Sequence, residues 1–589
     1  MRRTHHKRGE ALPRAFRGED KKKSAGGGTP IVIIAALLGA VYYVTRTHPT
    51  QHAAAHTNEI MQLIEAQNRT IAALRGAAAR AVAERASIAG ATTTPADRPP
   101  PSQPAAPSAT APADLAGVRD HSILGLDEAT FRATSVAELL KAYAPTLGGG
   151  TCERDFGNGL INRWRGERKT YCAPKVSGGS QVDCYLVKQS NHAGAGDNLC
   201  LGKNVRMNFR DFAGDLPRTY VKRYVDSRHQ QQHSKIKYSK GTWAGTCDTT
   251  AEWQARFFPG WNVNWFHGFQ SVDDLQCEVR ESAPTLIIER DTFANFFHDT
   301  EDFVNTLIAL AILEWNVKDL QILITDLYPK GPFWPIWDRV FFGSRKPLTS
   351  WDIKQKYGTK NVCFDNAAIA ILGAAAPITV ASFNTKCARS SIVRAYSDFV
   401  IRALGLQLRT RYHTKPNPQR VVVTFMARRS SGMWPEKRFC DSQTSFFLCE
   451  FVQHLGTRPL GRTIKNDQAV VDALKGLEQR SFANGAHVEF RDLDYSKLSF
   501  EEQIAANLDT DVMVGPHGAG LLHNIFMPDR AALVELFIDG SSANRHFHNL
   551  ARWQGRSYYG SAFSNPVRAQ QLVSVVAGAV ASLDLSKPY

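Results

Sequence analysis

The chain has 589 residues, of which 43% are hydrophobic, and a formal net charge of +16. This length exceeds that of most single domains, so we expect two to four units and enough chain for a sizeable core. Part of the positive charge lies in one short N-terminal tail, and the total therefore does not by itself indicate a nucleic-acid-binding surface.

Residues 1–23 form a basic tail that we place in the cytosol, and residues 24–45 carry no charge. At about 1.5 Å rise per residue, an uncharged helix of this length crosses a hydrocarbon layer of about 30 Å. Because the positive charge precedes the span, the pattern predicts a type II signal-anchor with everything after it on the far side of the membrane. A cleaved signal peptide is the alternative, but the basic region is long for one.

The residues 46–117 that follow are predicted to be a luminal stem. A thin, alanine-rich heptad stripe from Ile60 to Ala81 permits a weak coiled coil and, through it, a homodimer. Residues 91–113 hold seven prolines among Ala, Thr and Ser, which is typical of an extended linker. The stem also contains the one glycosylation sequon of the chain, at Asn68.

All ten cysteines lie beyond residue 150, on the predicted luminal side of the membrane. An oxidising lumen favours disulfide bonds, although the spacing does not give their pairing. A zinc site needs closely spaced ligand pairs, and no Cys-x-x-Cys occurs in the sequence. We therefore expect disulfides and no metal.

From about residue 118 onward the composition is that of ordinary soluble domains. Short apolar runs alternate with helical patterns; the runs are residues 285–289, 320–325, 421–426, 487–491, 511–514 and 532–537. This alternation predicts an α/β fold with parallel sheets covered on both faces. The length favours two doubly wound domains, residues 118–414 and 415–589, with a cleft between them.

The run 511–514 is followed by a glycine-rich turn, Gly515-Pro516-His517-Gly518-Ala519-Gly520, and then by a predicted helix over residues 521–527. Glycines let a backbone approach a ligand closely, and a helix start offers unpaired N–H groups, so this turn suits a phosphate. A plain tight turn is the alternative. The sequence is neither a P-loop nor a good dinucleotide fingerprint, because His523 stands at the third glycine position.

The turn, the residues up to Pro528 and the next strand, which ends in Glu535-Leu536, together resemble the signature of glycosyltransferase family 61. Within that family, further segments are similar in order and sequence to the plant core β-1,2-xylosyltransferases: residues 152–159, 289–298 with Asp302, 421–429 and 545–555. Two features depart from the plant pattern. Pro516 stands where alanine is usual, and residues 524–528 are closer to the members that transfer O-linked N-acetylglucosamine.

The resemblance implies a luminal, inverting enzyme with a GT-B-like architecture of two Rossmann-type domains, in a type II Golgi membrane protein. The first domain would be catalytic and carry a cysteine-rich insert, and the second would bind the nucleotide sugar. The expected reaction transfers xylose from UDP-xylose to the core mannose of a protein N-glycan, with no cofactor required. Transfer of N-acetylglucosamine to a protein hydroxyl or a glycan is the alternative, and a catalytically silent glycan-binding protein is the alternative of another class.

Inverting transfer needs a base near the acceptor hydroxyl. His298 and Asp302 lie four residues apart on a helix predicted over residues 295–313, and so share one face of it. We expect one of them to be the base and the other to orient it or the acceptor, with Asn295 nearby. A dipole-stabilised acid beside a packed histidine is the structural alternative.

The leaving diphosphate needs positive charge and hydrogen-bond donors. The resemblance assigns donor binding to two arginines after the strand 421–426, to the turn, and to an acid on the next strand; these residues are Arg428, Arg429, His517, Gly518, Ala519, Gly520 and Glu535. Adjacent strand residues point in opposite directions, so one arginine is expected to face the diphosphate and the other to form a salt bridge. Glu535 could bind ribose hydroxyls or simply face solvent.

Two further features have structural interpretations. Asp492 and Asp494 could hold a divalent cation, but a polar turn before a capped helix accounts for them. Basic clusters with aromatic residues, at residues 218–223 and 235–240, are interpreted as solvated faces, because a luminal protein meets no nucleic acid.

Overall fold

The protein is described by a computed structural model, which covers residues 124–146, 151–187, 197–212, 236, 238–251, 267–293, 295–326, 328, 330–371, 373–379, 388–406, 417–429, 462–538 and 544–586. The predicted tail, anchor and stem, with Asn68, lie outside the described residues. Within the described ranges, no helix has the length and apolar character needed to cross a membrane. Residues Asp114 to Tyr589 form one compact unit.

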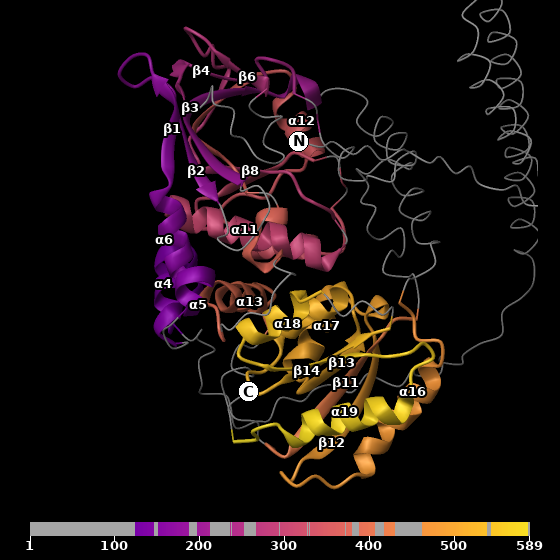
Figure 1. Ribbon diagram of the computed structural model, residues 1–589. Helices are drawn as coiled ribbons and strands as arrows, with labels where there is room; N and C mark the ends of the chain where they lie inside the picture. Colours follow the sequence, from indigo (N-terminus) through magenta and orange to yellow (C-terminus); the bar gives the residue numbers. More distant parts are fainter. Residues whose placement is uncertain are drawn as a thin grey trace, which may run out of the picture. The chain divides into compact units, whose positions relative to one another are not determined.

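The first part of this unit is mixed α/β (Figure 1). Its helices are α3 (Glu128–Ala133), α4 (Val136–Thr146), α5 (Thr151–Phe156), α6 (Asn158–Gly166), α11 (Phe296–Leu313), α12 (Ser350–Tyr357) and α13 (Ser391–Ala403). Its strands are β1 (Arg168–Pro174), β2 (Gln181–Val187), β3 (Asp197–Asn208), β4 (Trp243–Gly245), β5 (Cys247–Thr249), β6 (Phe269–Ser271), β7 (Val279–Glu281), β8 (Thr285–Ile288), β9 (Gln321–Ile324) and β10 (Asn361–Ile369). Short 3-10 and π segments connect several of them.

These strands form a ten-stranded mixed sheet with the main order β5-β1-β2-β3-β10-β8-β9. The predicted strands β8 and β9 pair in parallel, as expected, but β1, β2, β3 and β10 pair with one another antiparallel. The prediction of parallel sheets throughout is therefore wrong for this half. Its physical reason is that β1 to β3 mix polar and apolar residues, which antiparallel strands tolerate, and so they lack the apolar runs of buried parallel strands.

The second part contains a five-stranded sheet whose pairs are all parallel, in the order β12-β11-β13-β14-β15. Its strands are β11 (Arg420–Ala427), β12 (His487–Asp494), β13 (Val512–Pro516), β14 (Ala532–Phe537) and β15 (Ser557–Ala562), and its helices are α16 (Asp467–Lys475), α17 (Phe500–Leu508), α18 (His546–Trp553) and α19 (Ala569–Ala581). The four strands predicted in this half are confirmed.

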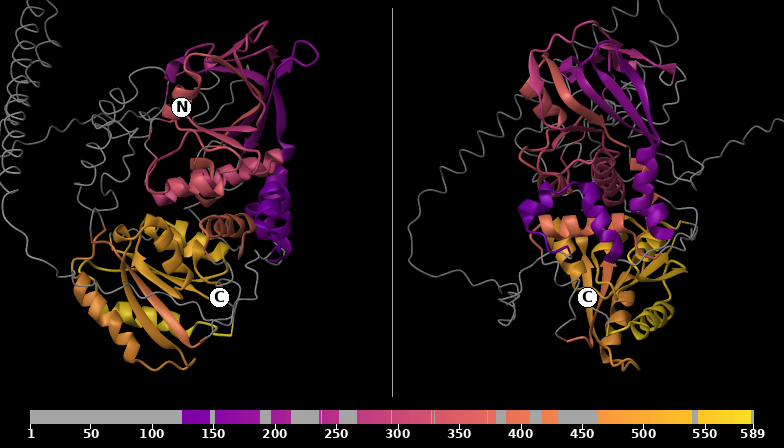
Figure 2. Two further views of the ribbon diagram at one scale, coloured as in Figure 1. Left: turned by 180° about the vertical axis from the view of Figure 1, so that it is seen from behind. Right: turned by 90° about the vertical axis from the view of Figure 1, so that its left-hand side faces the viewer.

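Both faces of the parallel sheet are covered (Figures 1 and 2). On one face, alternate residues such as Val423 and Val514 pack in one apolar cluster with Val470 of α16 and Val576 of α19. On the other, residues such as Met513 join a larger cluster with α17, α18 and helices of the first part, among them α11 and α13. The unit is therefore continuous in its apolar core, although it holds two separate sheets.

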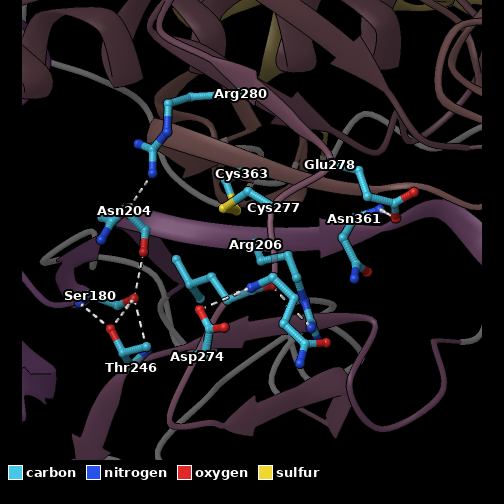
Figure 3. The surroundings of a disulfide bond; sticks show 12 residues. Ser180, Asn204, Arg206, Thr246, Asp274, Cys277, Glu278, Arg280, Asn361 and Cys363 are labelled. Atoms are coloured by element: carbon cyan, nitrogen blue, oxygen red, sulfur yellow. Dashed lines mark hydrogen bonds between the residues drawn. A yellow bond between two sulfur atoms is a disulfide. The ribbon is translucent and has the colours of Figure 1, made fainter.

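Disulfide bonds join Cys172 to Cys247, Cys184 to Cys200, and Cys277 to Cys363, and Cys152 is also disulfide-bonded. The prediction of disulfides is confirmed for these seven cysteines. Figure 3 shows the Cys277–Cys363 bridge, which links the segment before β7 to its partner strand β10. A neighbouring hydrogen bond runs from Arg280 of β7 to Oδ1 of Asn204 on β3 (Figure 3).

Candidate functional site

The strand order of the parallel sheet identifies the edge at which a ligand is expected. The chain passes from β11 to β12 at one side and then crosses back to β13, so the order reverses between the neighbours β11 and β13. In open α/β sheets, ligands bind beyond the carboxyl ends of the strands at this reversal. Arg428 and Arg429 follow β11, and the predicted glycine-rich turn begins within β13 and continues past its end.

The glycines of this turn make room for side chains at the end of β11. A Cβ atom on Gly518 would lie 2.4 Å from Nη1 of Arg428, and one on Gly520 would lie 2.5 Å from the sulfur of Met426. The expected helix after the turn is a 3-10 helix, η9 (Ala519–Phe526), rather than an α-helix. Its buried His523 donates from Nδ1 to the Gly520 carbonyl at 2.9 Å, and burial lowers its pKa to about 4.

The two arginines after β11 have different surroundings. Arg429 pairs with Asp467 and, at 2.8 Å, with Asp492. Arg428 is half-buried, and no acidic group among the described residues pairs with it; its Nε is buried without a hydrogen bond. Burial and the positive charge of Arg462 lower the pKa of Arg428. Of the two, Arg428 therefore has an uncommitted guanidinium at the ligand edge of the sheet.

His517 lies at the end of β13 and contacts the acid of the next strand. Its Nδ1 is hydrogen-bonded to Oε1 of Glu535, and its backbone N–H donates to Leu536 at 2.9 Å. Glu535 is fully buried, and its second oxygen accepts a hydrogen bond from the Tyr558 hydroxyl at 2.7 Å. Both oxygens of Glu535 are therefore committed to side chains of the protein, and its binding of ribose hydroxyls stays a prediction.

A second histidine–glutamate pair lies at the start of α11. Asn295 caps this helix by accepting from the backbone N–H of Phe297 at 3.2 Å. Nδ1 of His298, in the first turn, lies 2.8 Å from Oε2 of Glu301 and 3.3 Å from Oδ2 of Asp291. The His298 side chain is 39% exposed, whereas Glu301 is buried and also accepts from the Thr379 hydroxyl at 2.7 Å.

The surroundings of His298 favour its protonated form. Burial opposes the charge, but the hydrogen bond to Glu301 and the negative charges of Glu301, Asp291 and Asp299 outweigh it, so the pKa of His298 is raised. Burial likewise raises the pKa of Glu301. The two groups compete for protons across a hydrogen bond and titrate as a coupled pair. Such a pair can accept one proton from a hydroxyl that lies next to Nε2 of His298.

Asp302 has a different hydrogen-bond partner from His298, and the expectation that the two act together stays a prediction. No described contact joins the two side chains; Oδ2 of Asp302 instead accepts from the backbone N–H of Asp291 at 2.7 Å. Asp302 is 2% exposed, and burial raises its pKa well above the usual range. Its neighbour Asp299 is also buried, and burial raises its pKa to about 8. Burial therefore favours the protonated form of both carboxyl groups.

Aromatic rings connect the start of α11 to the turn after β13. Phe297, next to His298, stacks on His546 with ring centroids 4.5 Å apart and contacts Phe547 at 5.8 Å. Phe547 in turn packs against the ring of His517 at 5.3 Å. The helix α18, which follows the sheet strand β14, thus bridges the two histidine–glutamate pairs.

Among the described residues, Asp291, His298 and Glu301 form one group that could hold a metal ion, since their ligand atoms lie within 4.8 Å of one another. Asp492 and Asp494, which could also have formed a cation site, are committed elsewhere. Asp492 pairs with Arg429, and Asp494 accepts hydrogen bonds from the backbone and hydroxyl of Ser496. The structural interpretation of these two acids agrees with their contacts.

Sequence reasoning missed Asp291, Glu301 and Tyr558. Glu301 stands three residues after His298 and shares its helix face as Asp302 does, so spacing alone could have suggested it. Asp291 precedes the helix in a loop, and Tyr558 lies on a strand that was not predicted. No signal in the sequence pointed to either of these two.

Comparison with known proteins supports a glycosyltransferase. The family described as Glycosyltransferase 61 matches residues 296–534, from the start of α11 into β14. The matched region holds His298, Glu301 and His517, and it ends one residue before Glu535.

The chain is also similar to proteins named EGF domain-specific O-linked N-acetylglucosamine transferase. The one from Gallus gallus is 25% identical over 424 residues, which cover 69% of this chain and 65% of the relative. Those from Drosophila melanogaster and Bos taurus are 24% and 26% identical, with 67% and 64% of the relatives covered. The chain thus spans less than two thirds of the chicken and bovine relatives. By their names, these relatives transfer O-linked N-acetylglucosamine.

Proposed function

We propose that the protein is an inverting glycosyltransferase that moves N-acetylglucosamine from a UDP-linked donor to a hydroxyl of a protein acceptor. The observation that carries this proposal is the His298–Glu301 pair, a histidine held at Nδ1 by a buried carboxylate and raised in pKa. Phe297, next to His298, is connected through Phe547 to His517 at the ligand edge of the parallel sheet. The names of the similar proteins support the sugar and a hydroxyl of an EGF domain as the acceptor.

In the proposed reaction, the acceptor oxygen attacks C1 of the donor sugar, and the bond from C1 to the diphosphate breaks. The diphosphate leaves with the bonding electron pair. The hydroxyl proton passes to Nε2 of His298, which makes no described hydrogen bond, and Glu301 stabilises the imidazolium formed at Nδ1. Attack from the face opposite the leaving group inverts the configuration at C1.

The donor half of the site is proposed at the carboxyl edge of the parallel sheet. Arg428 supplies an unpaired guanidinium, and the turn Gly518-Ala519-Gly520 passes close to it. Such a cation stabilises the charge that grows on the leaving diphosphate. Arg429, held by Asp467 and Asp492, positions the end of β11 and does not contact the donor.

Transfer of xylose from UDP-xylose to the core mannose of a protein N-glycan remains a second proposal. It is supported by the ordered resemblance of residues 152–159, 289–298, 421–429 and 545–555 to plant xylosyltransferases. The two readings share the fold, the base and the diphosphate site. They differ in the sugar pocket, which must admit an N-acetyl group in one case and exclude it in the other.

The setting is proposed from the sequence and the disulfides. We propose a type II protein of the Golgi membrane, with an acceptor-side domain over residues 118–414 and a donor-side domain over residues 415–589 in a GT-B-like arrangement. The disulfide bonds support a luminal location. A metal is not part of the proposed chemistry, and a homodimer through the stem is proposed from the heptad stripe alone.

Donor-resolved transfer tests the function. The full chain, purified from a secretory host, is offered UDP-N-acetylglucosamine, UDP-xylose or UDP-galactose with a folded EGF domain or an agalacto N-glycopeptide, with and without EDTA. Mass spectrometry of the acceptor is expected to show an N-acetylhexosamine increment on the EGF domain that survives EDTA. A pentose increment on the glycopeptide would select the second proposal, and no increment with any pair would contradict both.

A further inference from the structure

We infer that Tyr558, Glu535 and His517 form a hydrogen-bonded relay that orients His517 as a donor to the leaving diphosphate. This inference rests on the proposed function and deepens it, because it assigns a positioning role to two residues of the donor half. His517 directly follows β13, Glu535 lies in the second half of β14, and Tyr558 is the second residue of β15; the three strands are neighbours in the parallel sheet.

The contacts fix the direction of the relay. Glu535 has no exposed surface, and it accepts from the Tyr558 hydroxyl at one oxygen and from Nδ1–H of His517 at the other. Burying a carboxylate oxygen without a hydrogen-bond donor costs folding free energy. The hydroxyl of Tyr558 supplies the donor for the second oxygen of Glu535. Burial and the charge of Glu535 raise the pKa of Tyr558, which therefore stays a donor.

A glycine on β15 makes this contact possible. In the register of β14 and β15, Gly560 stands directly opposite Glu535, and Tyr558 lies two residues away on the same face. A Cβ atom on Gly560 would lie 2.2 Å from the Tyr558 hydroxyl. The hydroxyl thus occupies the space that any side chain at Gly560 would take. The relay therefore involves four positions on three strands rather than one chance contact.

The ring of His517 is also held by packing. Phe537 stacks on it at 5.4 Å between centroids, and Phe547 contacts it edge to face at 5.3 Å. With Nδ1 donated to Glu535 and the ring clamped, Nε2 is the remaining polar atom, and it makes no described hydrogen bond. The next residue is Gly518, against which the Arg428 guanidinium lies.

This geometry suits recognition of a diphosphate. With Nδ1–H held by Glu535, Nε2 is the ring atom that faces a ligand, and when it carries a proton it can donate to a phosphate oxygen beside the Arg428 guanidinium. As the bond from C1 to the diphosphate breaks, the charge on that oxygen grows and the hydrogen bond strengthens. No proton needs to be transferred, so the reaction stays balanced as described above. Glu535 and Tyr558 act only through His517, and they are positioning residues.

Calorimetric titration with UDP tests the relay without depending on acceptor or sugar. The full chain is compared as wild type, His517→Gln, Glu535→Gln, the double variant, and Tyr558→Phe with and without His517→Gln. We expect Glu535→Gln to weaken UDP binding about tenfold, the loss of one charge-assisted hydrogen bond, and Tyr558→Phe to weaken it less. In the His517→Gln background, neither Glu535→Gln nor Tyr558→Phe is expected to weaken UDP binding further. Tyr559→Phe, on the same strand with its hydroxyl on Ser582, is the matched control.

The outcomes separate the relay from the function. If Glu535→Gln weakened UDP binding equally in the wild type and in His517→Gln, Glu535 would act on the stability of the sheet and not through His517. That result would overturn the relay. If Glu535→Gln does not fold, the Tyr558→Phe cycle decides by the same criterion. A wild type that does not bind UDP at all would instead contradict the proposed donor class, and the relay with it.

Discussion

At the scale of single residues, the candidate site consists of two histidines, each with Nδ1 on a buried glutamate. Glu301 and Glu535 are both nearly inaccessible, and the second oxygen of each accepts from a hydroxyl, Thr379 in one case and Tyr558 in the other. The histidines differ in their further neighbours, because only His298 has additional carboxyl groups around it. This difference supports a base at His298 and a hydrogen-bond donor at His517.

Replacing Glu301 by glutamine is expected to shift the pH dependence of transfer. The base must be unprotonated, so the rate falls as the pH drops through the pKa of the pair, which lies above the ordinary histidine value of about 6.5. Glutamine removes the charge that raises this pKa, and the acidic limb of kcat/KM moves to lower pH. The maximal rate is also expected to fall, since the imidazolium loses its partner.

The control for this change is Glu138→Gln, at an exposed position in the first turn of α4. Its profile should superimpose on that of the wild type. An acidic limb that stays in place in Glu301→Gln would show that the titrating group of the reaction is not His298.

The buried acid Asp299 predicts a pH dependence of stability. Its pKa is raised from 3.8 to about 8, so its favourable contribution is full below about pH 4 and is lost as the pH rises toward 8. In Asp299→Asn, the unfolding free energy should fall less steeply as the pH rises over this window, by up to about 1.4 kcal/mol per pH unit. The melting temperature should therefore also fall less steeply. Thermal scans from pH 5 to 8 measure it. A parallel curve for the variant would mean that Asp299 is ionised in the folded protein.

At the scale of secondary-structure elements, the sequence predicted the parallel half well. Each of its long apolar runs proved to be a strand, because strands buried on both faces leave little room for polar residues. The helix predicted over residues 295–313 is α11, and the structure adds that Asn295 is its N-cap. The antiparallel strands β1 to β3 could not be predicted in this way, since half of their residues are polar.

The side-chain partners of the site could be predicted only in part. Adjacent arginines on a strand face opposite ways, so a split between Arg428 and Arg429 was expected, but which of them is free depends on Asp467 and Asp492 from other elements. Likewise, Asp302 and Glu301 both share a helix face with His298. In the structure, Asp302 accepts a hydrogen bond from the Asp291 backbone N–H, and His298 is hydrogen-bonded to Glu301. The position of the loop that carries Asp291 could not be predicted from the sequence.

Within the turn after β13, Gly518→Ala is expected to weaken donor binding without unfolding the protein. The new methyl group would lie 2.4 Å from the end of the flexible Arg428 side chain, which can move away from it. Displacing this guanidinium from the diphosphate should cost about tenfold or more in affinity for UDP. Calorimetric titration and a thermal scan of the same sample measure the two effects separately.

Gly578→Ala serves as the matched control, because the added methyl group on α19 would meet nothing within 4 Å. It should leave UDP affinity unchanged. Unchanged affinity in Gly518→Ala as well would contradict a diphosphate site at Arg428.

At the scale of the whole molecule, one apolar cluster includes residues of the mixed sheet, of α11 and of the parallel sheet. The proposed sites of acceptor activation, at the start of α11, and of donor binding, at the ends of β11 and β13, therefore belong to one continuous unit. The described disulfide bonds lie in the first part of this unit. Their pairing depends on the fold and could not be predicted from spacing.

The central claim is that His298 activates the acceptor and Arg428 binds the donor diphosphate in one transfer reaction. The measurement that tests it most directly is UDP binding and sugar transfer, side by side, in His298→Ala and Arg428→Ala of the full chain. The account predicts that His298→Ala binds UDP as the wild type does but loses at least about a hundredfold in transfer, the usual contribution of a general base. Arg428→Ala should lose UDP affinity. If His298→Ala transferred sugar at the wild-type rate, or if Arg428→Ala bound UDP undiminished, the account would be contradicted.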